Sequence, residues 1–387
     1  MAVMRSAWRI IVGTVCGVTA AVMWAVSLAV YQQLMEPTGF FVDKENGSTY
    51  PNLASNNTYW PREIRHLAIL LAFAGVAVIC RARPRGLAAG AVGAIAWLSA
   101  DLWLDRIDID GRTAAIWLAA VGIATFAATA GVASWLTQGR PDSTRVRYVA
   151  SGTVTVLAAL TLLISTPWDE PVIEPDQVRI ENALSVMQVG LVVLFLVATV
   201  ALVVDGLTRA HAWWFAGFLA IAAAIAGVTL ATNGQSNSFS SMAMIVVGLL
   251  AVAAARDVPR TVLPAVAAAG LVMLPVVIVV VLIGGMIAGG TMTSIAGNPA
   301  VNGADTDLTF GLPGLVVGAL TALVTSIVAS APRAAEKGRA VPATPIPSRQ
   351  VWIDVPADGP TIDTTVSRNG MAPPRIRAAI ASAVCMV

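Results

Sequence analysis

Ten long apolar runs, separated by short polar segments, constrain this chain more than any other feature of its sequence. They cover about 8–31, 64–81, 86–104, 113–136, 146–166, 183–204, 211–232, 239–255, 261–288 and 309–331. About 20 helical residues cross a bilayer core, and lipid offers no partner to an unpaired backbone amide. Only 12% of the residues are charged, against about 25% in a soluble domain. The sequence therefore predicts an all-α fold, a polytopic transmembrane helical bundle of about ten spanning helices within 1–331.

The charges between the runs predict an orientation. With the N-terminus inside and the helices alternating, 18 of the 24 basic residues lie on the inner side and 15 of the 22 acidic residues on the outer side. Short inner loops of membrane proteins carry an excess of Lys and Arg. We therefore expect both termini to be cytoplasmic, in a plasma (inner) membrane. The first run is longer than the apolar part of a signal peptide and lacks a small-residue cleavage site, so we expect a retained helix.

Three polar regions remain outside the predicted helices. Two are outer loops, at 32–63 and 289–308, rich in Asn, Thr and Gly. The third is the end of the chain, 332–387, where prolines are frequent and no apolar period is present. Such a composition is typical of disorder. We expect a disordered cytoplasmic tail, in contact with either the membrane surface or other subunits of a membrane complex. The expected partners are the lipid bilayer and, through the tail, other subunits of a membrane complex, and nucleic acid is not expected.

Several kinds of chemistry have no motif here. The sequence contains no phosphate-binding Gly-rich loop ending in Lys-Ser/Thr, no Gly-x-Ser-x-Gly turn, no His-Glu-x-x-His and no Cys-x-x-Cys. The two histidines, His66 and His211, fall on opposite membrane faces in this topology. The sequence thus predicts no cofactor and no metal site, and it argues against ATP-driven transport by this chain alone.

Charged residues gather at the outer ends of the second and third predicted helices. Arg62 and His66 share one helical face, and so do Asp101 and Asp105. Because only a short turn joins the two helices, the two groups can meet. The sequence predicts an outer-face charged cluster of Arg62, Arg65, His66, Asp101, Asp105, Asp108 and Asp110. Two interpretations stay open, a structural ion network and a site for an anionic substrate or lipid headgroup.

The last two aspartates of that cluster belong to the segment Asp108-Ile109-Asp110-Gly111. It superficially resembles the start of a calcium loop, but the position of the twelfth ligand is Trp117, where a Glu is needed. A solvated turn is the simpler interpretation, with Asp108 or Asp110 capping the next helix. A cation-attracting vestibule is the alternative.

The first outer loop contains the paired carboxylates Asp43 and Glu45, on either side of Lys44. In these residues and in its position, the loop resembles that of membrane glycosyltransferases that use polyprenyl-phosphate donors. The resemblance implies that one carboxylate deprotonates the acceptor or holds a metal. It covers only three residues and the position of the loop, and a plain hydrated turn is the simpler interpretation.

The ninth run has residues that break or loosen helices. Pro264 and Pro275 are expected to interrupt it, and Gly284 and Gly285 to loosen its outer end. Broken helices line the transport sites of several transporter families, although spanning helices also tolerate proline as a simple kink.

Taken together, these features favour a transporter- or flippase-like protein for a small molecule or lipid over an enzyme. Two alternatives remain: a non-catalytic subunit of a membrane complex, which would use the tail as a contact, and an envelope glycosyltransferase-like enzyme, which would use Asp43 and Glu45.

Overall fold

The chain divides into two compact units, Met1–Gly338 and Arg339–Val387. A computed structural model describes the backbone of ten stretches, all in the first unit: 2–32, 40–42, 47–51, 60–139, 141–165, 175–204, 209–231, 237–255, 258–297 and 309–338. The second unit lies outside the described residues, so the predicted disorder of the tail stays a prediction beyond Gly338.

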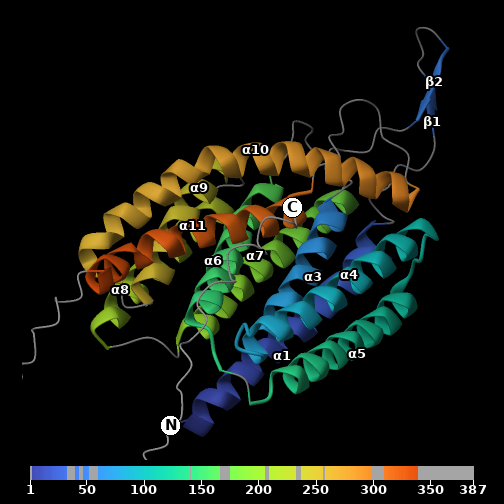
Figure 1. Cartoon of the computed structure of the whole chain (residues 1–387). Coiled ribbons are helices and arrows are strands. Elements are labelled where there is room, and N and C mark those ends of the chain that lie inside the picture. Colours follow the sequence, from blue (N-terminus) through green and yellow to red (C-terminus); the bar gives the residue numbers. More distant parts are fainter. Residues whose placement is uncertain are drawn as a thin grey trace, which may run out of the picture. The chain divides into compact units, whose positions relative to one another are not determined.

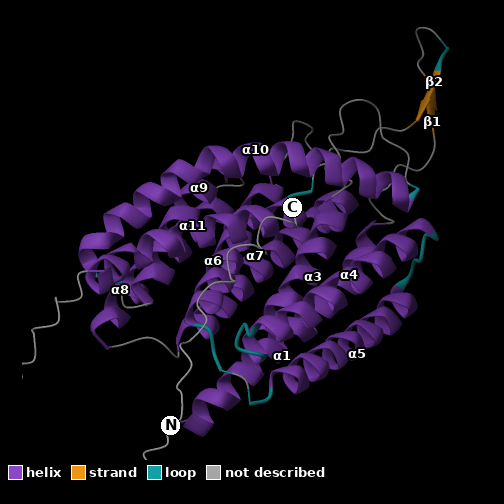
Figure 2. Ribbon diagram, viewed as in Figure 1, coloured by secondary structure: helices purple, strands orange, loops and turns teal. Residues whose placement is uncertain are grey.

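The described part of the first unit is helical apart from one short hairpin, which confirms the all-α class (Figure 2). The long helices are α1 (Ala2–Val26), α3 (Trp60–Ile79), α4 (Pro84–Arg106), α5 (Arg112–Thr137), α6 (Thr144–Thr161), α7 (Pro175–Val203), α8 (Arg209–Ala231), α9 (Asn237–Ala255), α10 (Leu263–Ala296) and α11 (Gly311–Gly338). A π-helical turn, Ser27–Gln32, continues α1. Strands β1 (Phe40–Val42) and β2 (Thr49–Pro51) pair antiparallel within the predicted first outer loop.

Local signals in the sequence explain several helix boundaries. Pro84 occupies the first turn of α4, where a missing amide hydrogen costs nothing. The Ser143 side chain accepts a hydrogen bond from the Val146 amide and caps α6. Gly297 ends α10 in the left-handed conformation, at a φ of 80°, which glycine adopts without a steric penalty.

Two helices, α3 and α6, lie inside the bundle (Figure 1). Helix α3 packs against α1, α4 and α7, and α6 packs against α7, α9 and α11. Helix α5 covers α1 and α4, whereas α10 lies along α11 and α9. Every residue of α3 is buried except Phe73 and Ile79.

Seven described segments are long and apolar enough to cross a membrane by length and composition, which indicates a membrane protein. They are Ala7–Gln32, Pro84–Arg106, Arg112–Thr137, Arg179–Val203, His211–Thr229, Arg260–Ala296 and Gly311–Ser330. A shorter apolar stretch, Phe239–Ala255, lies in α9. Helices α3 and α6 are not among the seven, so the predicted count of about ten spans stays a prediction.

The enclosed position of α3 and α6 explains why they can carry charged and hydroxyl side chains. Helix α3 begins with three charged residues, Arg62, Glu63 and Arg65. Helix α6 has hydroxyl side chains along its buried length, and those of Thr155 and Thr161 donate to backbone carbonyls one turn earlier. A helix surrounded by other helices needs no continuous apolar surface towards lipid.

Helices α1 and α3 approach each other closely at a pair of glycines. A Cβ atom added to Gly75 would lie 2.7 Å from the Gly13 carbonyl oxygen, and one added to Gly13 would lie 2.7 Å from the Gly75 carbonyl oxygen. On α11, Gly314 and Gly318 face α6 at similarly close range. Small residues four positions apart thus allow α11 to pack closely against α6.

The structure corrects the expected breaks in the ninth run. Helix α10 is continuous from Leu263 to Ala296, so Pro264 lies in its first turn and Pro275 is contained within it. Gly284 and Gly285 do not loosen the helix. A Cβ on Gly284 would lie 3.4 Å from Pro313 of α11, and the Gly285 carbonyl accepts a hydrogen bond from the Thr309 amide at 3.2 Å. These glycines form a contact between α10 and α11.

Three predicted boundaries also change. Helix α10 extends past residue 289 to Ala296, so the predicted outer loop 289–308 is shorter, and α3 already begins at Trp60, before the predicted end of the first outer loop. Helix α11 continues to Gly338, beyond the predicted start of the tail at 332.

Candidate functional site

Five of the seven residues predicted for the outer-face cluster lie together, and all five are buried. Arg62, Arg65 and His66 come from the first two turns of α3, and Asp101 and Asp105 from the last two turns of α4. Their exposed fractions range from 0% to 5%. We call these five residues the α3–α4 cluster. The expectation of a cluster is confirmed, but these side chains lie inside the protein instead of at a solvated surface.

Asp105 is the centre of the α3–α4 cluster and accepts from two arginines. Arg65 Nη1 and Nη2 donate to its two carboxylate oxygens at 3.2 and 2.9 Å, which is a bidentate pair. Arg62 Nε donates to Asp105 Oδ2 at 3.2 Å, and Arg62 Nη2 lies 3.0 Å from the same atom. Two guanidinium groups thus share one buried carboxylate.

Asp101, one turn earlier on α4, connects the α3–α4 cluster to α1. Its Oδ1 accepts a hydrogen bond from Trp24 Nε1 at 2.7 Å and lies 3.2 Å from Arg65 Nε. The Trp24 ring also packs edge-on against Trp97, with ring centroids 5.3 Å apart. Three helices are therefore joined through one carboxylate.

His66 is the least satisfied member of the α3–α4 cluster. Its Nε2 lies 3.6 Å from Asp101 Oδ2, too far for a hydrogen bond. Within the part of the chain that the structure describes, neither ring nitrogen of this 1%-exposed side chain has a hydrogen-bond partner, and neither has Asp101 Oδ2. Buried polar atoms are generally paired, so this corner of the α3–α4 cluster is suited to hold a water molecule or a polar ligand.

Two further contacts join the start of α3 to α10 and α11. Arg62 Nη1 donates to Thr293 Oγ1 of α10 at 2.7 Å. Glu63 accepts from Thr309 Oγ1 at 2.6 Å and from the Phe310 and Gly311 amides at 2.9 and 2.8 Å. The Glu63 carboxylate is thus the N-terminal cap of α11, where the helix dipole favours a negative charge.

Asp108 and Asp110 do not join the α3–α4 cluster. Both are exposed in the turn between α4 and α5, and Asp108 has a positive φ of 49°. The prediction that one of them caps α5 is wrong, because the N-cap is Gly111 and no side chain caps that helix. Gly111 has a φ of 95°, and its amide donates to the Ala29 carbonyl at 2.8 Å. This backbone contact joins the start of α5 to the turn that continues α1.

The other predicted site residues separate into two groups. Asp43 and Glu45 lie outside the described residues, so the resemblance to glycosyltransferases stays a prediction. Pro264, Pro275, Gly284 and Gly285 all lie on α10, whose last turns meet the α3–α4 cluster through Thr293. Among the described residues, no group of three or more His, Cys, Asp or Glu side chains could hold a metal ion.

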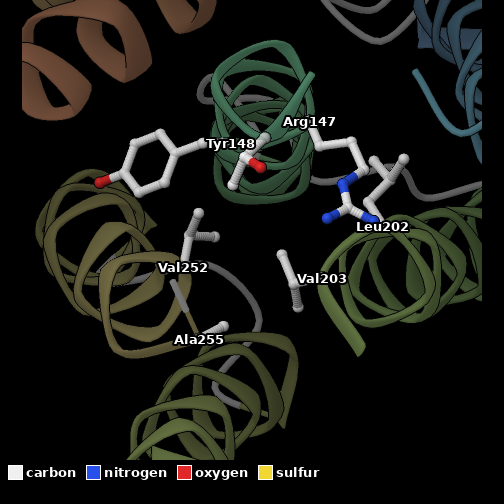
Figure 3. Close-up of a pocket in the computed structure, with 7 residues that line it drawn as sticks. Arg147, Tyr148, Leu202, Val203, Val252 and Ala255 are labelled. Atoms are coloured by element: carbon white, nitrogen blue, oxygen red, sulfur yellow. The ribbon is translucent and has the colours of Figure 1, made fainter. Parts of the chain in front are cut away.

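The structure also has a pocket at the start of α6, which sequence reasoning missed (Figure 3). Its volume is about 60 Å³, and it lies between α6, α7 and α9. It is lined by Thr144, Arg147, Tyr148, Leu202, Val203, Val252 and Ala255. In Figure 3 the Arg147 guanidinium extends towards Leu202 on α7, whereas the Tyr148 ring lies on the other side, towards α9.

Sequence reasoning also missed two partners of the α3–α4 cluster, Trp24 and Thr293, and the neighbouring contact between Glu63 and Thr309. Glu63 had the clearest signal, since it lies between two arginines at the start of an otherwise apolar helix. The contacts of Arg62 with Thr293 and of Glu63 with Thr309 join residues more than 200 positions apart in the chain. No local pattern in the sequence predicts a contact between residues so far apart.

Comparison with protein-family models, curated proteins and solved structures finds no match for this chain. The proposed function is therefore based on the chemistry of the α3–α4 cluster.

Proposed function

We propose that the protein is a plasma-membrane protein with ten spanning helices and both termini in the cytoplasm. Contacts between helix ends support this arrangement. The start of α3, the end of α4, the end of α10 and the start of α11 meet at the α3–α4 cluster, and the topology assigns all four to the outer side. The α3–α4 turn and the α5–α6 connection, both assigned to the inner side, meet where Arg81 and Arg83 pair with Asp142 at 3.0 and 2.8 Å.

We propose further that the protein moves or flips a small molecule or a lipid. The observation that carries this proposal is the α3–α4 cluster itself, in which two arginines, two aspartates and a histidine are buried among helices. Ionisable groups within membrane segments are costly, and they are retained mainly where a substrate, ion or proton is handled. The two arginines supply positive charge to an anionic group, and His66 supplies an unpaired polar atom.

A mechanism follows from the way the α3–α4 cluster joins helices. Arg62 contacts both Asp105 on α4 and Thr293 on α10. An anionic substrate group that competes with Asp105 for Arg62 would weaken the connection between α4 and α10. The last turns of α10 would then be held to α4 less strongly, with the hydrogen bond from Arg106 Nη1 to the Ile295 carbonyl at 2.9 Å still in place, and their separation would open a path from the outer side. Substrate binding and helix movement are thereby coupled through one guanidinium group.

The experiment is a transport assay on the full chain in proteoliposomes. The probes are fluorescent phosphatidylglycerol and phosphatidylcholine analogues, whose outer-leaflet label is bleached by dithionite, and a panel of organic anions followed by electrical recording. We expect protein-dependent movement of at least one probe and its loss in the R62Q/R65Q double variant. The matched control is D108N at an exposed position of the same end.

The outcome also separates transport from the alternatives. If R62Q/R65Q moves the same probe at the same rate and only unfolds more easily, the α3–α4 cluster is a structural ion network. If no probe moves with the native protein either, the non-catalytic subunit becomes the better hypothesis. The enzyme hypothesis is tested separately by the D43N/E45Q variant.

A further inference from the structure

We propose that the transported substrate is a lipid whose headgroup carries hydroxyl groups, and that it enters the protein between the ends of α4 and α10. This inference rests on the proposed transport function and specifies its substrate. Two features of the molecule support it: the unpaired polar atoms inside the α3–α4 cluster, and the apolar surface from which that cluster can be reached.

His66 and Asp101 form a pair one helical turn deeper than Arg62 and Asp105, between the same two helices. Both ring nitrogens of His66 and the Oδ2 atom of Asp101 have no hydrogen-bond partner among the described residues, although both side chains are buried. An ionised carboxylate only accepts hydrogen bonds, whereas a neutral imidazole donates from one nitrogen and accepts at the other. A hydroxyl group donates and accepts, so one hydroxyl can pair with Asp101 and with His66 together.

The charges in this corner favour a neutral group over an ion. An anion would meet the Asp101 carboxylate, whereas a cation would meet the Arg65 guanidinium, whose Nε lies 3.2 Å from Asp101 Oδ1. A water molecule has the same hydrogen-bonding groups as a hydroxyl and would occupy the corner when no substrate is bound. A hydroxyl of the substrate can displace that water without leaving His66 or Asp101 unpaired.

The last turns of α10 reach the end of α4, and we call this contact the α4–α10 seam (Figure 1). Two hydrogen bonds cross it in the described part of the chain, from Arg62 to Thr293 at 2.7 Å and from Arg106 to the Ile295 carbonyl at 2.9 Å. Because Arg62 also donates to Asp105, the α3–α4 cluster lies directly behind the seam. Further along its length α10 packs against α11 and α9, so the seam can open by a movement of its last turns alone.

The outer surface of the α4–α10 seam is apolar. Trp103 on α4 and Ile295 on α10 are exposed on either side of the exposed Arg106, and both helices contain segments apolar enough to cross a membrane. Tryptophan and arginine side chains are enriched where hydrocarbon meets the headgroups. A molecule that enters here comes from the bilayer, so its headgroup can reach the α3–α4 cluster while its acyl chains stay outside.

The headgroup is tested with two fluorescent lipids of equal charge in proteoliposomes that contain the full chain. Phosphatidylglycerol has free hydroxyl groups on its headgroup, whereas phosphatidylmethanol has none. Both carry the label on an acyl chain, and dithionite bleaches the label in the outer leaflet. We expect phosphatidylglycerol to move about ten-fold faster, since buried groups left without a hydrogen-bond partner cost about that factor. Equal rates for the two lipids overturn the hydroxyl assignment.

Variants of His66 test which side chain produces this preference. H66F removes both ring nitrogens, and we expect it to move the two lipids at equal rates. H66Q keeps one donor and one acceptor, so it should retain the preference for phosphatidylglycerol. The matched control is H211F, which makes the same change at the other histidine of the chain, in the first turn of α8. A preference that survives in H66F overturns the assignment to His66.

Entry through the α4–α10 seam is tested by joining its two sides. R106C and I295C are introduced together in a C385S background, since the remaining Cys16 and Cys80 are buried. A reducible bis-methanethiosulfonate reagent then spans the distance that the Arg106 side chain covers in the native protein. We expect phosphatidylglycerol movement to stop on cross-linking and to recover on reduction. The two single variants, treated in the same way, should keep moving the lipid.

The outcomes separate this inference from the proposed function. If the native protein moves organic anions but no lipid, or if lipid moves equally fast after cross-linking, transport stands and the lipid entry is overturned. If the native protein moves no probe at all, the proposed function fails and the lipid substrate fails with it.

Discussion

At the scale of single residues, burial separates aspartates that look equivalent in the sequence. Asp105 is 0% exposed and pairs with Arg62 and Arg65, whereas Asp108, three positions later, is exposed. In D105N both guanidinium groups lose their shared counter-charge inside the protein. Breaking a buried ion pair in this way typically costs about 3–5 kcal/mol.

We therefore predict that D105N lowers the free energy of unfolding by about 3–5 kcal/mol, while D108N stays within about 0.5 kcal/mol of the native protein. Unfolding of the purified protein in mixed micelles with increasing SDS measures both variants. Equal stability of D105N and D108N would contradict the burial of the α3–α4 cluster.

The two cysteines in the described residues lead to a second prediction at this scale. Cys16 and Cys80 are buried, at 0% and 3% exposure, and burial raises the pKa of the Cys80 thiol in the turn after α3. Both thiols should react slowly, because the thiolate is the reactive form and reagent access is blocked. We expect the C385S variant, which retains only these two of the three cysteines, to resist maleimide in native membranes and to react fully in SDS.

The residues of the α3–α4 cluster show how far local sequence patterns reach. Spacing of three or four residues placed Arg62 with His66 and Asp101 with Asp105 on common helical faces, and the short turn between α3 and α4 brought the two faces together. The same reasoning failed for Trp24 and Thr293, because those contacts depend on how distant helices pack. It also failed for Asp108, because no side chain caps α5.

At the scale of elements, Glu63 is the connection that fixes the start of α11. Its carboxylate accepts from Thr309, Phe310 and Gly311, all at the helix N-terminus. In E63A these buried donors lose their acceptor, which costs about 1–3 kcal/mol. We predict faster hydrogen–deuterium exchange of the Phe310 and Gly311 amides in E63A, measured by mass spectrometry on peptides from the start of α11.

The exposed Asp110 provides the control for this experiment, since D110N removes a carboxylate at a position that caps no helix. Unchanged exchange in E63A would mean that α11 is fixed by its packing against α6 and α10 alone. E63Q keeps an acceptor oxygen but loses the charge, so its exchange rate should fall between those of E63A and the native protein.

Helix α10 shows a second limit of sequence patterns at this scale. Proline and paired glycines predict a break when only the helix itself is considered. Helix α10 stays continuous through Pro275 and through Gly284-Gly285, because α11 packs against the glycines and contributes the Thr309 amide to the Gly285 carbonyl. At about 1.5 Å per residue, its 34 residues extend about 50 Å, well beyond a hydrocarbon core of about 30 Å.

At the scale of the whole molecule, the number of spans depends on α3, α6 and the shorter apolar stretch of α9. Length, hydropathy and a low number of charged residues together select seven segments, and α3, with Arg62, Glu63 and Arg65 in its first two turns, is not one of them. Helices α3 and α6 are enclosed by neighbours, so charged or hydroxyl side chains on them meet protein instead of lipid. The apolar runs still predicted both helices, since a run of apolar residues is also required for burial against other helices.

Labelling of single cysteines tests whether α3 and α6 cross the membrane. The background is C385S, in which Cys16 and Cys80 are expected to be unreactive. Ser48 and Arg85 are exposed positions on either side of α3, and Arg145 and Arg179 are exposed positions on either side of α6. If both helices span, S48C and R179C react with a membrane-impermeant maleimide from the outer side, whereas R85C and R145C react only after the membrane is opened.

If α6 instead turned back within the protein, R145C and R179C would react from the same side, and every later helix would reverse its direction. Such a reversal would put the start of α11 and the start of α3 on opposite sides of the membrane. In the structure these two helix starts are in contact, because the Gly311 amide donates to Glu63 at 2.8 Å, and this contact argues for the crossing.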